Sequence, residues 1–136
     1  MCYNMTALLQ EEIMKKILIS LTLVLLLCGC KEEKEYSCIF KDERTDDMKS
    51  YVRVTLTSED DIVKNERLYA VYKFKDAKSA EDGYSTIEEV FKQDISVKIE
   101  QKEERIIAQG EKDVSEMKYE LEGKISYYEQ LGYTCK

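Results

Sequence analysis

The pattern that most restricts the fold is a strict alternation of residue types over residues 51–57. Val52, Val54 and Leu56 are apolar, whereas the residues between them are polar or aromatic. A period of two places these two sets on opposite sides of a β-strand. The strand therefore has one face suited to a core and one face that no core needs to cover, which is typical of antiparallel sheets.

Two neighbouring segments have the same strand character. Residues 36–40 are aromatic and β-branched, and residues 66–74 alternate in the same way as residues 51–57. In the third segment one side is expected to carry Leu68, Ala70, Tyr72 and Phe74. The connecting segments 41–47 and 58–61 are polar and acidic, so we interpret them as hairpin loops. These segments together predict an antiparallel meander.

Helical spacing appears twice after the third predicted strand. Ser79 and Asp82 have the spacing of a capping box, and the expected buried face after them carries Tyr84, Ile87, Val90 and Phe91. A second helical pattern begins at Ser115, and its apolar positions are Met117, Leu121, Ile125, Tyr128 and Leu131. We expect Gly123 to divide this second stretch and Gly132 to end it in left-handed geometry.

Further strands are predicted around the second helix. Residues 95–99 alternate, residues 105–109 form another apolar segment, and residues 133–136 suit a short final strand beside the first one. The resulting order is βββαββαβ. It predicts an α+β domain with an antiparallel sheet of about five or six strands and two helices on one face.

An apolar run over residues 17–28 precedes this domain and follows two lysines. It is shorter than the roughly 20 apolar residues of a spanning helix, and its length suits a secretion signal. Its end, Leu27-Cys28-Gly29-Cys30, resembles the lipobox of bacterial lipoproteins. The resemblance implies cleavage before Cys30 and a diacylglycerol on its sulfur. The protein is then lipid-anchored at the extracytoplasmic face of the cell membrane.

The signal also predicts how the chain is divided. The acidic residues Glu11 and Glu12 do not suit the basic start of a signal, so we expect translation to begin at Met14 rather than at Met1. We therefore divide the chain into a wrongly assigned extension (1–13), a lipoprotein signal peptide (14–29), a short charged tether (30–35) and a single α+β domain (36–136). The short tether keeps the domain close to the membrane.

Cysteine usage follows from the same interpretation. With Cys30 lipidated, the cysteines that remain after cleavage are Cys38 and Cys135, near opposite ends of the domain. Outside the cytoplasm such a pair predicts a disulfide, and two buried free thiols are the alternative.

Composition restricts the function. The chain contains no histidine, which removes the commonest general base and the commonest transition-metal ligand. Removing residues 1–29 takes away two lysines and two glutamates, so the net charge stays at −7. This acidity disfavours nucleic acid as a partner. The acidic segments 42–47 and 59–61 lack the central glycine of an EF-hand loop, so we interpret them as hairpin tips and expect no metal and no cofactor.

A second resemblance concerns the whole predicted mature chain. The lipobox, the charged tether, Tyr36-Ser37-Cys38 and Gly132-Tyr133-Thr134-Cys135-Lys136 resemble the YehR-like group of small uncharacterised lipoproteins. This resemblance implies no particular activity.

The candidate binding residues are Tyr51 and Tyr69, which should lie on the side of the sheet opposite Tyr72. Tyrosine is amphipathic and orders at low entropic cost, so it suits contact surfaces. We therefore predict a non-enzymatic binding module whose partner is an envelope protein or a wall polymer. The alternatives are a hydrolase of envelope glycans that uses carboxylates alone and a structural spacer without a ligand.

Overall fold

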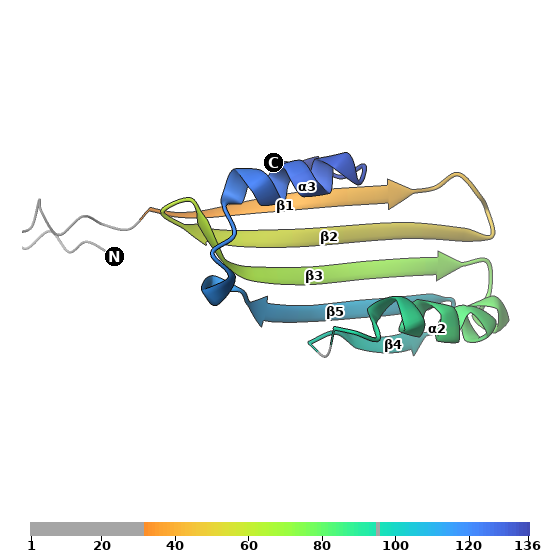
Figure 1. Ribbon diagram of the computed structural model, residues 1–136. Coiled ribbons are helices and arrows are strands. Elements are labelled where there is room, and N and C mark those ends of the chain that lie inside the picture. The colour runs from red at the N-terminus through yellow and green to blue at the C-terminus, as the bar shows by residue number, and fades with distance from the viewer. Residues whose placement is uncertain (1–31, 95) are drawn as a thin grey trace, which may run out of the picture. The chain divides into compact units, whose positions relative to one another are not determined.

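The computed structural model describes residues 32–94 and 96–136, and these residues form one antiparallel sheet with helices on one side (Figure 1). The elements in chain order are β1 (Glu33–Asp42), β2 (Met48–Glu59), β3 (Ile62–Phe74), α2 (Ala77–Phe91), β4 (Lys98–Lys102), β5 (Arg105–Asp113), the 3₁₀ turn η3 (Ser115–Met117), α3 (Leu121–Gln130) and β6 (Thr134–Cys135). The six strands lie in the order β4-β5-β3-β2-β1-β6. The predicted α+β class and the order βββαββαβ are confirmed.

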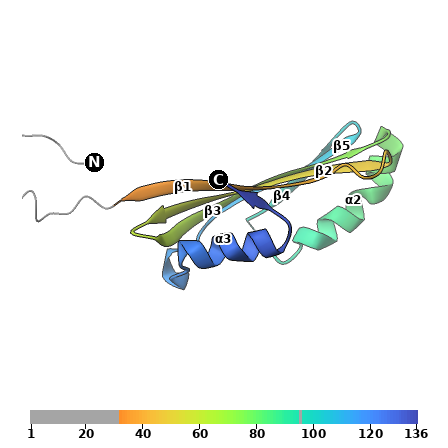
Figure 2. The ribbon, with the colours of Figure 1, turned by 90° about the horizontal axis from the view of Figure 1, so that it is seen from above.

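Both helices lie against the same face of the sheet, as Figure 2 shows from above. We call this the helix-covered face, and the opposite one, which no helix of the described residues covers, the helix-free face. Because side chains alternate along a strand, the cross-strand register assigns every residue to one face. The helix-free face carries the odd-numbered residues of β1, of β2, of β3 from Asn65 and of β5, and the even-numbered residues of β4.

The core lies between the helix-covered face and the two helices. Val52, Val54 and Leu56 are all buried there, as their alternation predicts. The cluster near α3 contains Cys38, Val54, Leu56, Val63, Val114 and Leu121. The cluster near α2 contains Ala80, Ile87 and Ile106.

The first helix begins earlier than its capping pattern predicts. Asp76 is the N-cap, and its carboxylate accepts a hydrogen bond of 2.7 Å from the backbone N–H of Ser79. Asp is as good an N-cap as Ser. Asp76, three residues before Ser79, therefore caps the helix in place of Ser79. Val90 was expected on the buried face, but it is 66% exposed. Ile87 and Phe91 face the sheet, and Val90 is turned about 100° away from Phe91 around the helix axis.

The second helical stretch is divided before Gly123, not at it. Lys118 adopts a left-handed conformation with φ of 56°, and this ends η3. The next residues are held by the β2–β3 hairpin, since Tyr119 O accepts from Val63 N at 2.8 Å and Leu121 N donates to Asp61 O at 2.9 Å. Gly123 therefore lies inside α3. Gly132 has a φ of 92° after α3, in agreement with the predicted left-handed end.

Most strands are longer than predicted. β2 begins at Met48 instead of residue 51, β3 begins at Ile62 instead of residue 66, and β5 continues to Asp113 instead of residue 109. β1 begins at Glu33, three residues before the predicted start, because all of its residues pair with residues 50–59 of β2. β4 covers Lys98–Lys102 instead of residues 95–99, and Ile95 itself lies outside the described residues.

The last strand returns to the first one. β6 pairs antiparallel with β1, which places Cys135 opposite Cys38. Their Sγ atoms are 2.01 Å apart, which is a disulfide bonding distance. This geometry agrees with the predicted disulfide.

Several predictions concern residues outside the described part of the chain. They are the N-terminal extension, the signal peptide and the lipidated Cys30. Among the described residues, no helix has both the length and the apolar character needed to cross a membrane.

Candidate functional site

The two candidate tyrosines lie on the helix-free face. Tyr51 of β2 is paired with Val71, and Tyr69 of β3 is paired with Arg53, so both have the parity of that face. Tyr72 lies on the other side of the sheet, where its ring centroid is 6.4 Å from that of Phe91 in α2. The three tyrosines therefore divide between the faces as the alternation predicts.

The two candidate tyrosines, Tyr51 and Tyr69, each lie beside a cation. Lys41 Nζ is 5.8 Å from the centroid of the Tyr51 ring, and Arg53 Cζ is 5.7 Å from that of Tyr69. These distances are within the range of cation–π contacts, which are worth about 0.5–1 kcal/mol at exposed sites. The pairs hold the rings against the sheet and leave polar groups at its surface.

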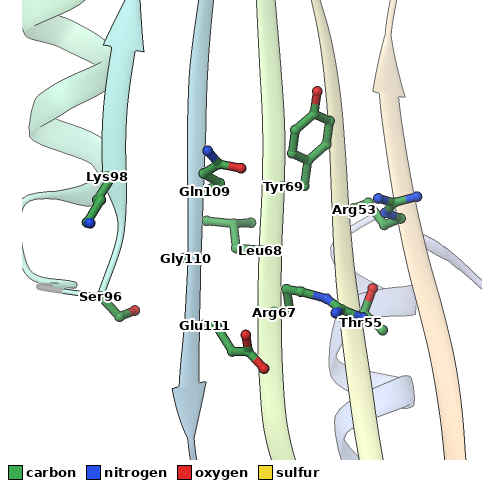
Figure 3. Close-up of a pocket in the computed structure, with 10 residues that line it drawn as sticks. All are labelled: Arg53, Thr55, Arg67, Leu68, Tyr69, Ser96, Lys98, Gln109, Gly110 and Glu111. Atoms are coloured by element: carbon green, nitrogen blue, oxygen red, sulfur yellow. The ribbon is translucent and has the colours of Figure 1, made fainter.

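The two tyrosines do not share one pocket. Tyr69 lines an open hollow of about 660 Å³ over the middle of the sheet, with residues of β2, β3, β5 and the start of β4 (Figure 3). Tyr51 lines a second hollow of about 510 Å³ next to β6. The second hollow is formed by Ser37, Ile39, Lys41, Tyr51, Gly132, Thr134 and Lys136.

The hollow at Tyr69 contains a line of side chains that crosses the strands. Arg53 pairs with Tyr69, Tyr69 with Gln109, and Gln109 with Lys98. Figure 3 shows these four side chains spread over the neighbouring strands. A ring, an amide and two cations at this spacing suit an anionic or hydroxyl-bearing ligand. Arg53, Gln109 and Lys98 could not be identified from the sequence, because they belong to three separate segments and the register between these segments is a tertiary property.

The neighbouring positions along the strands are more balanced in charge. Arg67 Nη2 lies 3.7 Å from Glu35 Oε2, and both side chains are more than half exposed. Glu111, opposite Arg67, accepts a hydrogen bond from Asn65 Nδ2. Thr55, between Arg53 and Arg67 in the hollow, is almost fully buried although it is on the helix-free face. The stems of long cationic side chains cover such small residues.

A different polar cluster lies on the helix-covered face. Glu66 is only 7% exposed, and its Oε1 lies 2.6 Å from Lys124 Nζ of α3. The same Nζ is 4.2 Å from the centroid of the Tyr119 ring. Burial, and then the nearby charge of Glu66, raise the pKa of the Tyr128 phenol. This cluster joins α3 to β3.

Two pairs of carboxylates in this region bear on the hydrolase alternative. Glu66 lies with Asp94 in one hollow, and with Glu120 in a second hollow of about 550 Å³. Lys112 Nζ lies 3.3 Å from Asp94 Oδ2 and 4.0 Å from Glu66 Oε2, so one lysine bridges both groups. The Ser96 hydroxyl lowers the pKa of Asp94 by donating to its carboxylate, and Lys112 acts in the same direction. The hollow that Glu66 and Asp94 share measures about 100 Å³. Ligand pockets usually measure about 300–1,000 Å³, so this hollow does not favour a sugar substrate.

The acidic hairpin segments are engaged in local ion pairs. Arg44 Nη2 lies 2.7 Å from Asp42 Oδ2, and hydrogen bonding from Arg44 lowers the pKa of Asp42 to about 2. Lys34 Nζ lies 3.6 Å from Asp61 Oδ1. Among the described residues, no group of three or more His, Cys, Asp or Glu side chains is arranged to hold a metal ion.

Comparisons of the chain with family models, with curated proteins and with solved structures found no match. The function of the protein is therefore inferred from its residues and their geometry. The helix-free face combines partly exposed rings, cations and two open hollows. A further open hollow of about 550 Å³, beside Tyr119, Lys124 and Tyr127, lies on the helix-covered side.

Proposed function

We propose that the protein is a lipoprotein, anchored through a lipid on Cys30 at the extracytoplasmic face of the cell membrane, that works as a non-catalytic binding module. Its helix-free face meets an envelope protein or a wall polymer close to the membrane surface. The observation that carries this proposal is the row Arg53, Tyr69, Gln109 and Lys98 in an open hollow of about 660 Å³.

The physical character of the face supports recognition. Tyr51 and Tyr69 present rings that lose little entropy on binding, because a tyrosine has only two side-chain torsions. The cations beside the rings provide donors without acceptors, so they select carboxylate, phosphate or hydroxyl oxygen. Both hollows are open, which suits a chain or a protein surface better than an enclosed small molecule.

The anchor and the fold support the proposed location. β1 begins at Glu33, three residues after Cys30, so a lipid on Cys30 keeps the sheet near the membrane. A disulfide between Cys38 and Cys135 suits an oxidising compartment.

The binding face is tested by cross-linking the protein in its native membrane. The variant Tyr51→Ala with Tyr69→Ala should lose its cross-linked partner, whereas Tyr127→Ala should keep it. Tyr127 is the matched control because it is an exposed tyrosine of α3, on the helix-covered side. If the cross-linked species are the same in both variants, the helix-free face is not the binding surface.

The anchor is tested separately with the two cysteines of the lipobox. Cys30→Ala should abolish lipidation and release the protein from the membrane fraction, whereas Cys28→Ala should leave both unchanged. Mass spectrometry of the N-terminal peptide measures the lipid directly. An unmodified chain in the wild type contradicts the anchor.

A further inference from the structure

The helix-free face carries a second row that crosses the strands, and this row consists entirely of cations. Lys49 of β2 pairs with Lys73 of β3, Lys73 pairs with Arg105 of β5, and Arg105 pairs with Lys102 of β4. All four side chains are exposed. We call these four residues the basic row. It lies where β2 and β5 begin and where β3 and β4 end.

The basic row is poorly neutralised. Among the described residues, Lys49, Lys73 and Arg105 make no ion pair, and Lys102 Nζ lies 2.6 Å from Glu100 Oε1. Like charges directly opposite each other on neighbouring strands are destabilising. In a chain whose net charge is −7, four cations in register are not a consequence of composition. The basic row therefore lowers the stability of the fold, and binding of an anionic ligand is a reason for the chain to keep it.

The residues next to the basic row on β2, β3 and β5 are aromatic or aliphatic, whereas on β4 the neighbour is Glu100, which pairs with Ile107. One step along the strands, Tyr51 pairs with Val71, and Val71 pairs with Ile107. All three are partly buried. A line of cations thus runs beside a line of aromatic and aliphatic carbon. This combination suits a polymer that has charged groups and carbon segments along one chain.

The opposite end of the same face is acidic. Glu33 and Glu35 of β1 and Asp113 of β5 lie there, at the end where the chain comes from Cys30. β1 has ten residues, which is about 33 Å of strand. That distance exceeds the Debye length of about 8 Å at physiological salt, so the acidic end does not cancel the field of the basic row.

We propose that the basic row binds a linear polyanion of the wall, a polyol-phosphate chain whose phosphates lie over the cations and whose carbons lie over Tyr51, Val71 and Ile107. This inference rests on the proposed function of the helix-free face and names the ligand class. Strands are about 4.8 Å apart, so the four cations extend over about 14 Å. That length accommodates two or more phosphates of such a chain.

The arrangement favours this ligand over the other anionic partners. A membrane surface is disfavoured because Glu33 and Glu35, acidic residues of this face, follow Cys30 within five residues of the chain and would be repelled by anionic headgroups. An acidic protein needs an apolar interface core of standard size, and one line of three partly buried residues does not supply it.

The test uses the full-length protein in nonionic detergent and end-labelled poly(glycerol phosphate) as the probe, with binding measured by fluorescence anisotropy. The row variant is Lys49→Gln with Lys73→Gln. The control is Lys78→Gln with Lys92→Gln, which makes the same change in charge on α2. At about 1 kcal/mol for each cation near an anionic surface, the row variant should bind roughly 10- to 30-fold more weakly. The control should stay within about twofold of the wild type, since its lysines lie outside the row.

Salt and lipid provide two further measurements. The affinity should fall as salt rises, and less steeply in the row variant, because fewer counterions are released. Because the lipid on Cys30 inserts into any bilayer, the lipid surface is tested without detergent by comparing neutral vesicles with vesicles that have anionic headgroups. Anionic headgroups should give no gain in binding. Tighter binding to the anionic vesicles, lost in the row variant, would overturn the polymer in favour of a lipid surface.

Failure of this inference is distinguishable from failure of the proposed function. If the row variant and the control bind the polymer equally, the basic row is not its site. If cross-linking to the partner nevertheless depends on Tyr51 and Tyr69, the helix-free face is still the binding surface, and only the proposed ligand class is wrong. Circular dichroism of both variants shows whether they remain folded.

Discussion

The two faces of the sheet differ in the burial and pairing of their charged side chains, although both faces belong to the same strands. On the helix-covered face, the charge of Glu66 is almost fully buried and lies 2.6 Å from Lys124. On the helix-free face, Lys49 and Lys73 are exposed, opposite each other and without an ion pair among the described residues. The first face is arranged for stability. The second keeps charges that stability alone does not require.

The largest difference between the faces should appear when side chains of β2 are truncated. Leu56 is fully buried, so Leu56→Ala should lower the free energy of unfolding by about 2–5 kcal/mol, from lost burial and a residual cavity. Arg53→Ala on the other face removes the contact with the Tyr69 ring and should lower it by no more than about 1 kcal/mol. Urea denaturation followed by tyrosine fluorescence measures both. Equal losses would mean that the two faces do not differ in this way.

Ion pairs offer a second comparison. Glu66→Gln should cost about 3 kcal/mol, because it leaves the Lys124 ammonium, only 17% exposed, without its nearest carboxylate. Glu35→Gln removes the partner of Arg67, whose side chain is 53% exposed, and should cost less than about 1 kcal/mol.

The same denaturation experiment measures both variants. Lys124→Met completes a double-mutant cycle with Glu66→Gln and isolates the coupling energy of the buried pair. A coupling energy near zero would show that Glu66 and Lys124 do not stabilise each other.

Sequence patterns predicted the faces well, because parity is a local property. The alternation at Val52, Val54 and Leu56 correctly assigned the buried side of β2, and the same parity assigned Tyr51 to the open side. Gly132 was also predictable, since a left-handed residue after a helix favours glycine. Each of these conclusions depends on residues close together in the chain.

Two features were not predictable: the register between the strands, and the position at which a helix is interrupted when several local sequence signals compete. The basic row joins four segments, and only the pairing of Lys49 with Lys73, and of Lys73 with Arg105, brings their charges together. In the same way, Gly123 was expected to interrupt a helix, yet the interruption occurs at Lys118 because tertiary hydrogen bonds hold the following residues to the β2–β3 hairpin. Patterns formed by neighbouring residues in the sequence contain no information about which distant segments will pair.

Alkaline pH should weaken the helix-covered side. Burial raises the pKa values of Tyr72, Tyr128 and Tyr133 above the ordinary phenol value of about 10. An acid whose pKa is higher in the folded state contributes stability below the unfolded pKa and loses it as pH rises through the folded pKa. Stability should therefore decline from about pH 10 upward. Urea denaturation between pH 8 and pH 11 is the measurement.

Tyr128→Phe is the matched variant for this pH dependence. It keeps the ring and removes the phenol whose pKa both burial and Glu66 raise. Its stability should therefore fall less steeply with alkaline pH than that of the wild type. The same slope in both proteins would show that Tyr128 makes no contribution to the pH dependence.

The smallest expected change in stability should also be the most informative. Removal of a lysine should stabilise the protein on the helix-free face and destabilise it on α2. Lys73→Gln removes the central cation between Lys49 and Arg105, so it should raise the free energy of unfolding by about 0.2–1 kcal/mol. The gain should shrink at high salt, where the repulsion is screened. Lys78→Gln, which breaks a 2.8 Å pair with Asp82 on α2, should instead lower stability slightly. A protein that becomes more stable and binds poly(glycerol phosphate) less tightly when it loses Lys73 keeps that cation for its ligand. A protein that becomes less stable uses Lys73 to hold the sheet together, and the basic row is then part of the fold.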